Sequence, residues 1–382
     1  MEAYLDNSAT TKPCGEVAAL IGRMAGDAWY NPSALYRPAL EIQKRIDRVR
    51  DICLEAAGAG GNRIVFTSGG TESDNLAILG HMRSRQGGTV LMSSVEHPAV
   101  SACAAELKRT GHPVEAIPAG KTGTVDLEKL EEMLGPDTAM ICVMQVNNET
   151  GAVEPLEEIV RLRNRYCPGA AIHVDGVQGF LRVPMAFSRL GIQSYALSGH
   201  KIHALKGTGA LIFARDHAIR PLQFGGGQEG NIRSGTENTF GILSLGEAVA
   251  SWRPEDCRKM RELKNRLWSE ISGRIPSALV NGPDPASDIS APHILNVSLA
   301  PVRSQTMLFA LEGDSVYVSA GSACASRKQK ISPVLKAMGI PPERADCSLR
   351  FSLSRETSEE EICFAAERLA AHYETLKKYT RR

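Results

Sequence analysis

Short runs of β-forming residues alternate with helical patterns from about residue 60 to residue 215, and this alternation limits the fold more than any other feature. The run Arg63–Thr67 ends at a Gly-Gly turn, and residues 71–85 then carry apolar side chains at helical spacing. Such a succession predicts a mostly parallel sheet with helices on both faces. We expect further strands over Thr89–Met92, Thr138–Met144, Ala170–Val174, Gln193–Leu197 and Thr208–Phe213, and further helices over Pro98–Thr110, Asp126–Leu134 and Pro155–Tyr166.

The pattern changes after about residue 252, where a helical stretch leads into shorter β-like segments and a charged final helix. The 382 residues also exceed what a single core usually holds. We therefore expect an α/β fold in two parts: a large domain over residues 15–252 with the mostly parallel sheet, and a smaller α+β domain formed by residues 1–14 and 253–382. The segments of the smaller domain are Glu255–Ile271, Ile294–Ser298, Ser315–Val318 and Ser358–Tyr379.

Charge and composition exclude several classes of protein. The 44 Lys and Arg residues nearly cancel the 43 Asp and Glu residues, so neither nucleic acid nor an anionic membrane is expected as a partner. No apolar run approaches the roughly 18 residues that a membrane span needs, and no leader pattern is visible, so we expect a cytoplasmic protein. The nine cysteines include no C-x-x-C pair, which argues against a disulfide framework or a zinc site, and no metal is expected.

The strongest chemical signal is the motif Ser198-Gly199-His200-Lys201, directly after an apolar run. A lysine at a strand end can be partly desolvated, which lowers the pKa of its amine and makes it nucleophilic towards an aldehyde. Ser198 and His200 would donate hydrogen bonds to a phosphate. Lys201 is therefore a candidate Schiff-base lysine for pyridoxal 5'-phosphate, and a solvated lysine in a surface turn is the alternative for this motif alone.

A second polar group, His173–Gln178, ends another predicted strand. A pyridoxal cofactor acts as an electron sink only while its ring nitrogen stays protonated, and a buried carboxylate keeps it so. Asp175 is the candidate for that carboxylate, and Gln178 is the candidate donor to the phenolic oxygen of the ring. Taken singly, an aspartate at this position is also an ordinary helix N-cap.

The turn Ser68-Gly69-Gly70-Thr71 has the form of an anion cradle. Two glycines let the backbone close around an oxyanion, and the helix that begins there points its free N–H groups towards it. The Gly70 N–H group and Thr71 would bind the phosphate. Glycine-rich turns between strands and helices are common, so this motif gains its meaning only from the others.

Two further strand ends carry His97 and Asn148. His97 would stack on the cofactor ring and move protons, and Asn148 would bond the ring oxygen or the substrate. A structural role is the alternative for His97 taken alone. All five motifs follow predicted strands, and open α/β sheets bind their ligands at the carboxyl ends of the strands.

The second domain contributes a cysteine and an arginine. Cys324 lies among small residues just before Arg327 and Lys328, and nearby cations favour the thiolate. Arg350 has apolar neighbours on both sides and would grip a substrate carboxylate with two hydrogen bonds. A buried inert thiol and a structural salt bridge are the respective alternatives.

Taken in order, these residues resemble the cysteine desulfurases, the NifS- and IscS-like members of the class V aminotransferase family of fold-type I pyridoxal phosphate enzymes. The resemblance covers nearly the whole chain. Beyond the motifs above, it includes Tyr4–Thr11, Asn31-Pro32-Ser33, Arg233–Asn238 and Gly321–Cys324.

The resemblance implies a homodimer in which Thr236 binds the phosphate of the neighbouring subunit. It implies that L-cysteine is converted to L-alanine and that Cys324 takes the sulfur as a persulfide for an acceptor or cluster-scaffold protein, in iron–sulfur cluster assembly or thiolation. Lys201 would remove the Cα proton, Arg350 and Asn148 would hold the carboxylate, and His97 would assist with protons. The context of Cys324 resembles the branch of the family with a long catalytic loop.

The sequence departs from the family pattern in four places. Gly70 replaces a common alanine, and Gly176-Val177 stands where alanine usually follows the aspartate. Tyr36 replaces a histidine after Asn-Pro-Ser, and Ser354 replaces a glycine after the arginine strand. These departures leave the cofactor residues in place and concern the shape of the substrate pocket.

Two other functions are compatible with parts of the pattern. The first is a selenocysteine lyase or another lyase of the same fold, and Cys324 argues against lyases that need no thiol. The second is a catalytically silent scaffold for sulfur assembly, against which the intact Lys201, Asp175, His97 and Cys324 argue. Activity on cysteine, selenocysteine and cysteine sulfinate, and the colour of the purified protein, distinguish these functions.

Overall fold

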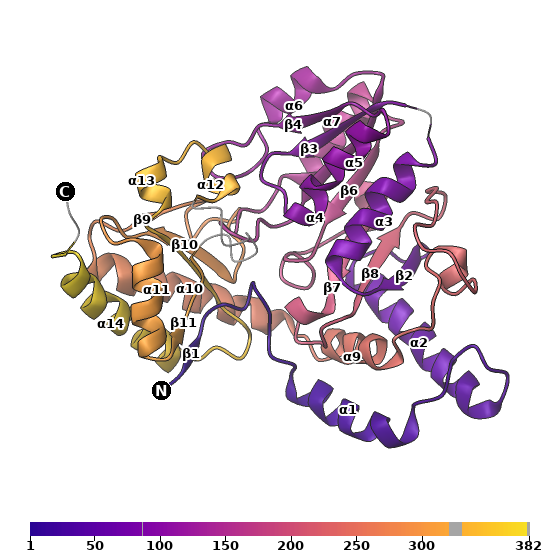
Figure 1. Ribbon diagram of the computed structural model, residues 1–382, viewed down its shortest axis with the longest axis horizontal. Helices are drawn as coiled ribbons and strands as arrows, with labels where there is room; N and C mark the ends of the chain where they lie inside the picture. Colours follow the sequence, from indigo (N-terminus) through magenta and orange to yellow (C-terminus); the bar gives the residue numbers. More distant parts are fainter. Residues whose placement is uncertain (86, 321–330, 380–382) are drawn as a thin grey trace.

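The computed structural model describes residues 1–85, 87–320 and 331–379, and its main body is a seven-stranded sheet in the order β2-β8-β7-β6-β5-β3-β4 (Figure 1). Neighbouring strands are parallel except at β8, which runs antiparallel to both β2 and β7. All strands other than β8 therefore end at the same edge. The bounds are β2 Arg63–Thr67, β3 Thr89–Ser93, β4 Val114–Ile117, β5 Thr138–Met144, β6 Ala171–Asp175, β7 Ser194–Ser198 and β8 Gly209–Phe213.

These strands confirm the predicted α/β fold with a mostly parallel sheet. Each strand predicted in this region is present within one residue of its expected ends, because each is a buried apolar run with turn residues after it. Only β4 was not predicted, since two of its four side chains are exposed and it lacks an apolar run. The predicted helix Pro98–Thr110 is interrupted at Ala102, which separates α4 (Pro98–Ser101) from α5 (Cys103–Arg109).

Helices cover both faces of the large sheet, as alternating side chains of the strands require. Met140 and Cys142 of β5 pack into a cluster with Ile78 of α3 (Gly70–Met82) and Leu107 of α5. Ile141 and Val143 point the other way, into the main core. That core also takes side chains from α1 (Gly15–Asp27), α2 (Arg37–Ala56), α6 (Leu127–Met133), α7 (Leu156–Tyr166), α8 (Phe187–Leu190) and α9 (Thr239–Ala250).

A second core belongs to the C-terminal part of the chain. Its sheet has the order β12-β10-β9 with antiparallel neighbours, formed by Ser348–Ser352, Ile294–Ser298 and Leu279–Val280. Helices α10 (Pro254–Arg274), α11 (Ser304–Gly313) and α14 (Glu359–Leu376) contribute apolar side chains to this core. Two short helices, α12 (Pro333–Ala337) and α13 (Pro342–Ala345), lie above β9 and β10 in Figure 1, and α12 is the nearer of the two to the large sheet.

The first residues of the chain connect the two cores. Strand β1 (Ala3–Tyr4) pairs in parallel with β11 (Val316–Tyr317), so the N-terminal end lies on the smaller core (Figure 1). Residues 5–12, called here the bridging segment, then run to the large sheet. Asn7 Nδ2 donates to the carbonyl of Ser352 at 3.0 Å, and the Thr11 N–H group donates to the carbonyl of His200 at 2.9 Å. The bridging segment therefore passes over the end of β7.

Within the described ranges, no helix combines the length and the apolar character needed to cross a membrane. Nor do the described residues hold any group of three or more His, Cys, Asp or Glu side chains arranged to bind a metal ion.

Candidate active site

A cavity of about 620 Å³ lies at the edge where the parallel strands end. It brings together four residues that the sequence assigned to a phosphate: Gly70 and Thr71 at the start of α3, and Ser198 and His200 after β7. The first turn of α3 lines it, so free backbone N–H groups are available to an anion. Lys206 also lines the cavity. Sequence reasoning missed this lysine because nothing near it forms a motif.

Two of the departures from the family pattern depend on each other in space. A Cβ atom on Gly70 would lie 2.6 Å from a methyl group of Val177, so alanine does not fit at the cradle beside this valine. A Cβ atom on Gly176 would lie about 2.0 Å from the ring of the buried Tyr195. Gly70 therefore leaves room for Val177, and Gly176 leaves room for Tyr195. The backbone of the cradle does not have to move to accommodate either side chain.

The other two departures lie away from the cavity. Tyr36 precedes α2, is half exposed, and packs edge-on against Tyr30 with ring centroids 6.0 Å apart. Ser354 is buried in the turn before α14, where its N–H group donates to Thr357 Oγ1 and its hydroxyl accepts from the Glu356 N–H group. Neither residue lines the cavity within this chain.

Lys201 ends a 3-10 turn, η1 (Gly199–Lys201), directly after β7. Its Nζ atom donates to two carbonyls of the bridging segment, at 2.6 Å to Ser8 and 2.7 Å to Ala9. Beside it, burial together with Lys201 and Lys206 lowers the pKa of His200 to about 4. His200 is therefore neutral near pH 7 and brings a hydrogen bond to the cavity without bringing charge.

Asp175 ends β6 and is almost fully buried. Its Oδ1 atom accepts from the Val177 N–H group at 2.9 Å, and no lysine or arginine of the described ranges forms an ion pair with it. Burial, and then the nearby Asp74, raise the pKa of Asp175 to about 7. A buried carboxylate of this kind is stabilised by a cation. The protonated ring nitrogen of pyridoxal phosphate is such a cation, so the donor set fits the cofactor.

A buried chain of hydrogen bonds lies next to Asp175 and was not predicted. His173 Nε2 lies 3.1 Å from Asp74 Oδ1, and His173 Nδ1 lies 2.9 Å from Ser194 Oγ. All three side chains are fully buried, so they cannot contact a substrate. The signal in the sequence was a histidine inside a buried apolar strand, two residues before the aspartate.

His97 and Asn148 follow strands as expected, but they make hydrogen bonds that the sequence did not indicate. His97 is the N-cap of α4, and its Nδ1 atom accepts from the Ala99 N–H group at 3.1 Å. In the neutral ring the proton is therefore on Nε2. Asn148 uses its backbone carbonyl, which accepts from Arg350 Nη1 at 2.8 Å.

Arg350 lies on β12 with only 3% of its surface exposed. Its Nη2 atom donates to Asp6 Oδ1 of the bridging segment at 2.7 Å, so the structural salt bridge considered above is present. Its Nε atom is buried and has no hydrogen-bond partner among the described residues. Asp6 and the Asn148 carbonyl thus hold the guanidinium plane.

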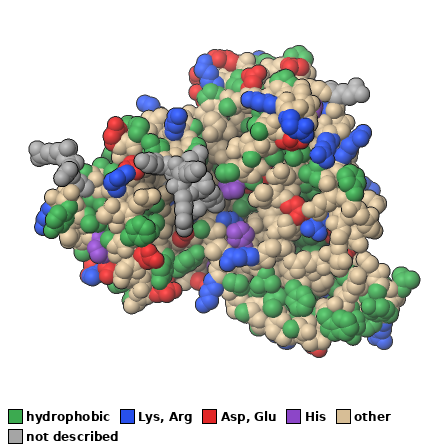
Figure 2. Space-filling view, in the orientation of Figure 1, with side chains coloured by type: hydrophobic (Ala, Val, Ile, Leu, Met, Phe, Trp, Pro, Cys, Tyr) green, Lys and Arg blue, Asp and Glu red, His purple; other side chains and the backbone are tan. Residues whose placement is uncertain are grey.

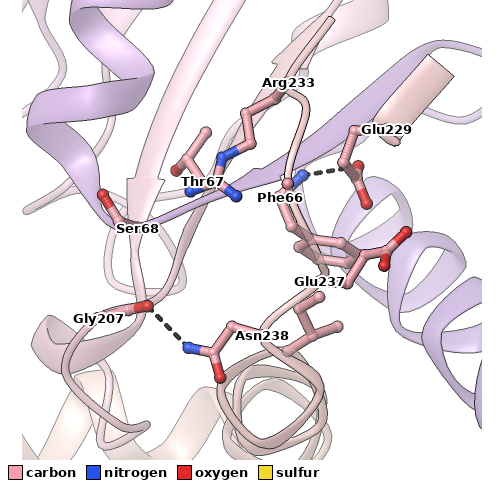
Figure 3. A pocket seen from close by; sticks show the side chains of 10 residues that line it. Phe66, Thr67, Ser68, Gly207, Glu229, Arg233, Glu237 and Asn238 are labelled. Atoms are coloured by element: carbon pink, nitrogen blue, oxygen red, sulfur yellow. Dashed lines mark hydrogen bonds between the residues drawn. The ribbon is translucent and has the colours of Figure 1, made fainter. Parts of the chain in front are cut away.

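The loop before α9 carries Thr236 and is fixed beside the cradle (Figure 3). Glu229 accepts from the Phe66 N–H group at 2.9 Å, and Asn238 Nδ2 donates to the Gly207 carbonyl at 2.9 Å. Arg233 pairs with Glu72 at 2.7 Å. Thr236 itself is exposed and is not among the residues that line the phosphate cavity of its own chain.

Cys324 lies outside the described residues. The eight cysteines in the described ranges are buried or partly buried, and burial raises the pKa of Cys53 and Cys103 to about 12. These two thiols are therefore protonated and unreactive near pH 7. Ser332, at the start of α12, donates to Glu149 Oε2 at 2.5 Å, which ties this helix to the strand end that also carries Asn148.

Three comparisons with known proteins agree. Residues 3–363 match the family model described as aminotransferase class-V. The chain is 34% identical to the cysteine desulfurase IscS of Dictyoglomus turgidum over 98% of this chain and 95% of the relative, and 36% identical to the cysteine desulfurase NifS of Azotobacter vinelandii over 94% and 90%. A solved structure titled NifS-like protein superposes with a TM-score of 0.90 at 29% identity, covering 98% of this chain and all of the other.

Proposed function

Because this chain belongs to the class V aminotransferase family, whose members use pyridoxal phosphate, we propose that it is a cysteine desulfurase that moves the sulfur of L-cysteine to Cys324 and releases L-alanine. The observation that carries the proposal is the buried Asp175, which has no lysine or arginine partner among the described residues, at the same edge of the sheet as Lys201 and the glycine cradle. When bound, the cofactor supplies an electron sink for the negative charge that develops at the substrate Cα atom.

The residues of the large domain would hold the cofactor at five points: the phosphate, the ring nitrogen, the phenolic oxygen, the ring face and the aldehyde carbon. The Gly70 N–H group, Thr71, Ser198 and His200 would bind the phosphate, and Asp175 would keep the ring nitrogen protonated. Gln178 would donate to the phenolic oxygen, His97 would lie against the ring, and Lys201 would hold the aldehyde carbon through its amine. The fit of charges supports this arrangement, since the anion cradle after β2 and the buried carboxylate at the end of β6 lie at the same edge of the sheet, with β8 and β7 between their strands.

Arg350 would bind the substrate carboxylate through its guanidinium group, assisted by Asn148. Lys201 would take the Cα proton, and the carbonyls of Ser8 and Ala9 would then accept hydrogen bonds from the resulting ammonium, as they do in the structure. The Cys324 thiolate would form an S–S bond to the substrate sulfur while the C–S bond of cysteine breaks. His97 Nε2 would supply or receive the proton that this exchange requires.

We also propose that the chain forms a homodimer. Four large apolar side chains are exposed here, three between α1 and α2 and one near the start of α2, and Figure 2 shows hydrophobic groups gathered in this part of the surface. Monomers rarely expose such a patch. The exposed fractions are 64% for Trp29, 91% for Leu35, 52% for Tyr36 and 44% for Leu40. Thr236, which is exposed and does not line the cavity of its own chain, would then reach the phosphate of the second subunit.

Mixing two inactive variants tests the shared site. Alone, the Lys201→Ala protein should show no turnover. Alone, the Thr236→Ala protein should bind the cofactor weakly and turn over poorly. A mixed dimer contains one site with both Lys201 and Thr236, so the mixture should recover turnover in proportion to the mixed dimer formed. If no activity returns although mixed dimers are seen by mass spectrometry, Thr236 serves its own subunit and the proposed sharing is wrong.

For the destination of the sulfur we propose a kind of acceptor and not an individual protein. The relatives named IscS and NifS are cysteine desulfurases, and for this chain we propose a cytoplasmic setting and a protein acceptor or cluster scaffold as the partner. We propose that Cys324 delivers a persulfide to such a partner in iron–sulfur cluster assembly or thiolation. Capture of the persulfide form on an affinity resin, followed by mass spectrometry, identifies the acceptor.

Changing Cys324 to serine tests the function itself. The variant should keep the visible absorbance of the bound cofactor and should lose alanine and persulfide formation from cysteine, because the sulfur has no acceptor. Cys363→Ser is the matched control, since Cys363 is partly exposed and lies on α14, and this variant should turn over normally. Wild-type turnover in the Cys324→Ser variant would contradict the proposal.

A further inference from the structure

The side-chain amide of Gln178 has two chemically opposite ends, and its contacts determine which end points where. Its Nε2 atom lies 3.0 Å from the carbonyl oxygen of Ser8, which can only accept a hydrogen bond. Its Oε1 atom lies 3.2 Å from Nε2 of His293. Because the amide nitrogen must face the carbonyl, the amide oxygen faces His293, and His293 must donate from Nε2.

The surroundings of His293 allow one arrangement of its protons. The ring is fully buried, and its Nδ1 atom has no hydrogen-bond partner in the described part of the chain. The tautomer with a proton on Nδ1 would bury an unpaired N–H group and set two lone pairs against each other at Gln178. A charged ring is also disfavoured, because burial and the cations Arg182, Lys264 and Arg350 hold the pKa of His293 well below its ordinary value of 6.5.

His293 reaches this position from the smaller core. It directly precedes β10, and the Leu353 N–H group after β12 donates to its backbone carbonyl at 2.8 Å. Gln178 belongs to the turn after β6 of the large sheet. The contact between their side chains therefore joins the sheet that carries Arg350 to the strand end that carries Asp175. Among the described residues, no other donor reaches Gln178 Oε1.

We propose that His293 is a positioning residue that keeps Gln178 oriented as a hydrogen-bond donor to the phenolic oxygen of bound pyridoxal phosphate. This inference rests on the proposed function. One N–H bond of the amide goes to Ser8, and the second stays available for the ring oxygen. Without His293 only the Ser8 carbonyl still opposes a turn of the amide, and a turned amide would present its oxygen to a negatively charged oxygen that it cannot bond.

Replacing His293 by leucine tests the proposal without measuring turnover. A donor at the phenolic oxygen stabilises the negative charge there most strongly when the neighbouring Schiff-base nitrogen has lost its proton. Loss of that donor should raise the midpoint pH of the visible absorbance change of the bound cofactor by about one unit, the size expected for one hydrogen bond to a charged group. The Gln178→Leu variant should show the same displacement.

Two control variants separate positioning from general structural damage. His293→Gln keeps an N–H donor and should return the midpoint close to that of the wild type. Asn281→Ala removes buried hydrogen bonds to Asn296, Ser298 and Ser348 in the same sheet, so it should lower the melting temperature and leave the midpoint unchanged.

Each outcome supports or overturns either the inference on His293 or the proposed function. An unshifted midpoint in His293→Leu, with a normal visible band in the wild type, overturns this inference alone. If His293→Leu does not fold, His293→Gln decides: a midpoint near that of the wild type supports the inference, and one displaced as far as in Gln178→Leu overturns it. A wild-type protein that shows no visible band with added pyridoxal phosphate overturns the proposed function, and this inference with it.

Discussion

The large-domain side of the candidate site consists of residues that follow strands of one sheet, whereas the small-domain side consists of residues that reach it across the boundary between two cores. Gly70, Asp175 and Lys201 need only the parallel sheet to be brought together. Arg350 and His293 need contacts with residues far away in the chain, namely Asp6 with Arg350 and Gln178 with His293. The first side is defined by the sheet, and the second depends on how the two cores fit.

This difference predicts that variants of the two sides fail in different ways. Changes on the large-domain side should affect the chemistry and the spectrum of the cofactor. A change at Arg350, on the small-domain side, should affect the binding of substrate and leave the cofactor spectrum unchanged, whereas a change at His293 acts through Gln178 and should displace the spectrum. The predictions below test this separation in order of decreasing effect.

The largest effect is expected for Asp175→Asn, which should lower kcat by about 10³-fold, because a neutral amide no longer stabilises the protonated ring nitrogen. Alanine formation and the cofactor spectrum measure it. Asp126→Asn is the control, since Asp126 caps α6 through the N–H groups of Glu128 and Lys129 and asparagine caps equally well. If Asp175→Asn has as little effect as the control, Asp175 is merely a capping residue.

Arg350→Gln should lower kcat/KM by about 100-fold, mainly by raising KM, since glutamine cannot make charged hydrogen bonds to a carboxylate. Steady-state kinetics and an unchanged cofactor spectrum check this. Arg344→Gln, in the same domain, removes a bond to the Val280 carbonyl and should reduce stability without raising KM. A fall in kcat alone, or loss of the cofactor, would break the proposed division between the two sides.

The smallest effects concern stability, and the two cores should respond to pH in opposite directions. Burial raises the pKa of Glu154, in the large domain, to about 8, so its stabilising effect is present below about pH 4.5 and is lost as the pH rises through 8. Burial lowers the pKa of Lys264, on α10, to about 7, so its effect is present above about pH 10.5 and is lost as the pH falls through 7.

Each of these two residues makes the unfolding free energy depend on pH, by up to about 1.4 kcal/mol per pH unit. Glu154→Gln and Lys264→Met should each remove one of these two dependences. Between pH 5 and 8, Glu154→Gln should lose less stability than the wild type. Between pH 7 and 10, Lys264→Met should gain less stability than the wild type as the pH rises. Urea unfolding of all three proteins at four pH values measures both. Parallel curves for a variant and the wild type would show that the residue does not titrate as its burial implies.

The sequence predicted the large-domain side well because strand ends are local features. A buried apolar run followed by Ser198–Lys201, or by Ser68–Thr71, shows both the strand and the polar group after it. Parallel pairing then places these groups at one edge whatever the order of the strands. The strand bounds and the cavity residues follow from this reasoning.

The same reasoning could not find the contacts that cross between the cores. Nothing in the sequence near residue 6 indicates a partner near residue 350, because the two meet only through the packing of β12 against the bridging segment. His293 looks like any histidine before an apolar strand. The compensation between Gly70 and Val177 was visible only as two unrelated departures, since their contact depends on how α3 approaches the end of β6.

The bridging segment also determines when the site can be completed during synthesis of the protein. Asp6 cannot contact Arg350 until a further 344 residues have been synthesised, and Asn7 cannot contact Ser352 until a further 345 have been. At about 5–20 residues per second, this interval lasts roughly 20–70 s on the ribosome. The large sheet and its glycine cradle can form in that time, but the carbonyls that hold Lys201 lie on a segment whose other attachment has not yet been made. The nascent chain therefore has a place for the phosphate well before it has a finished active site.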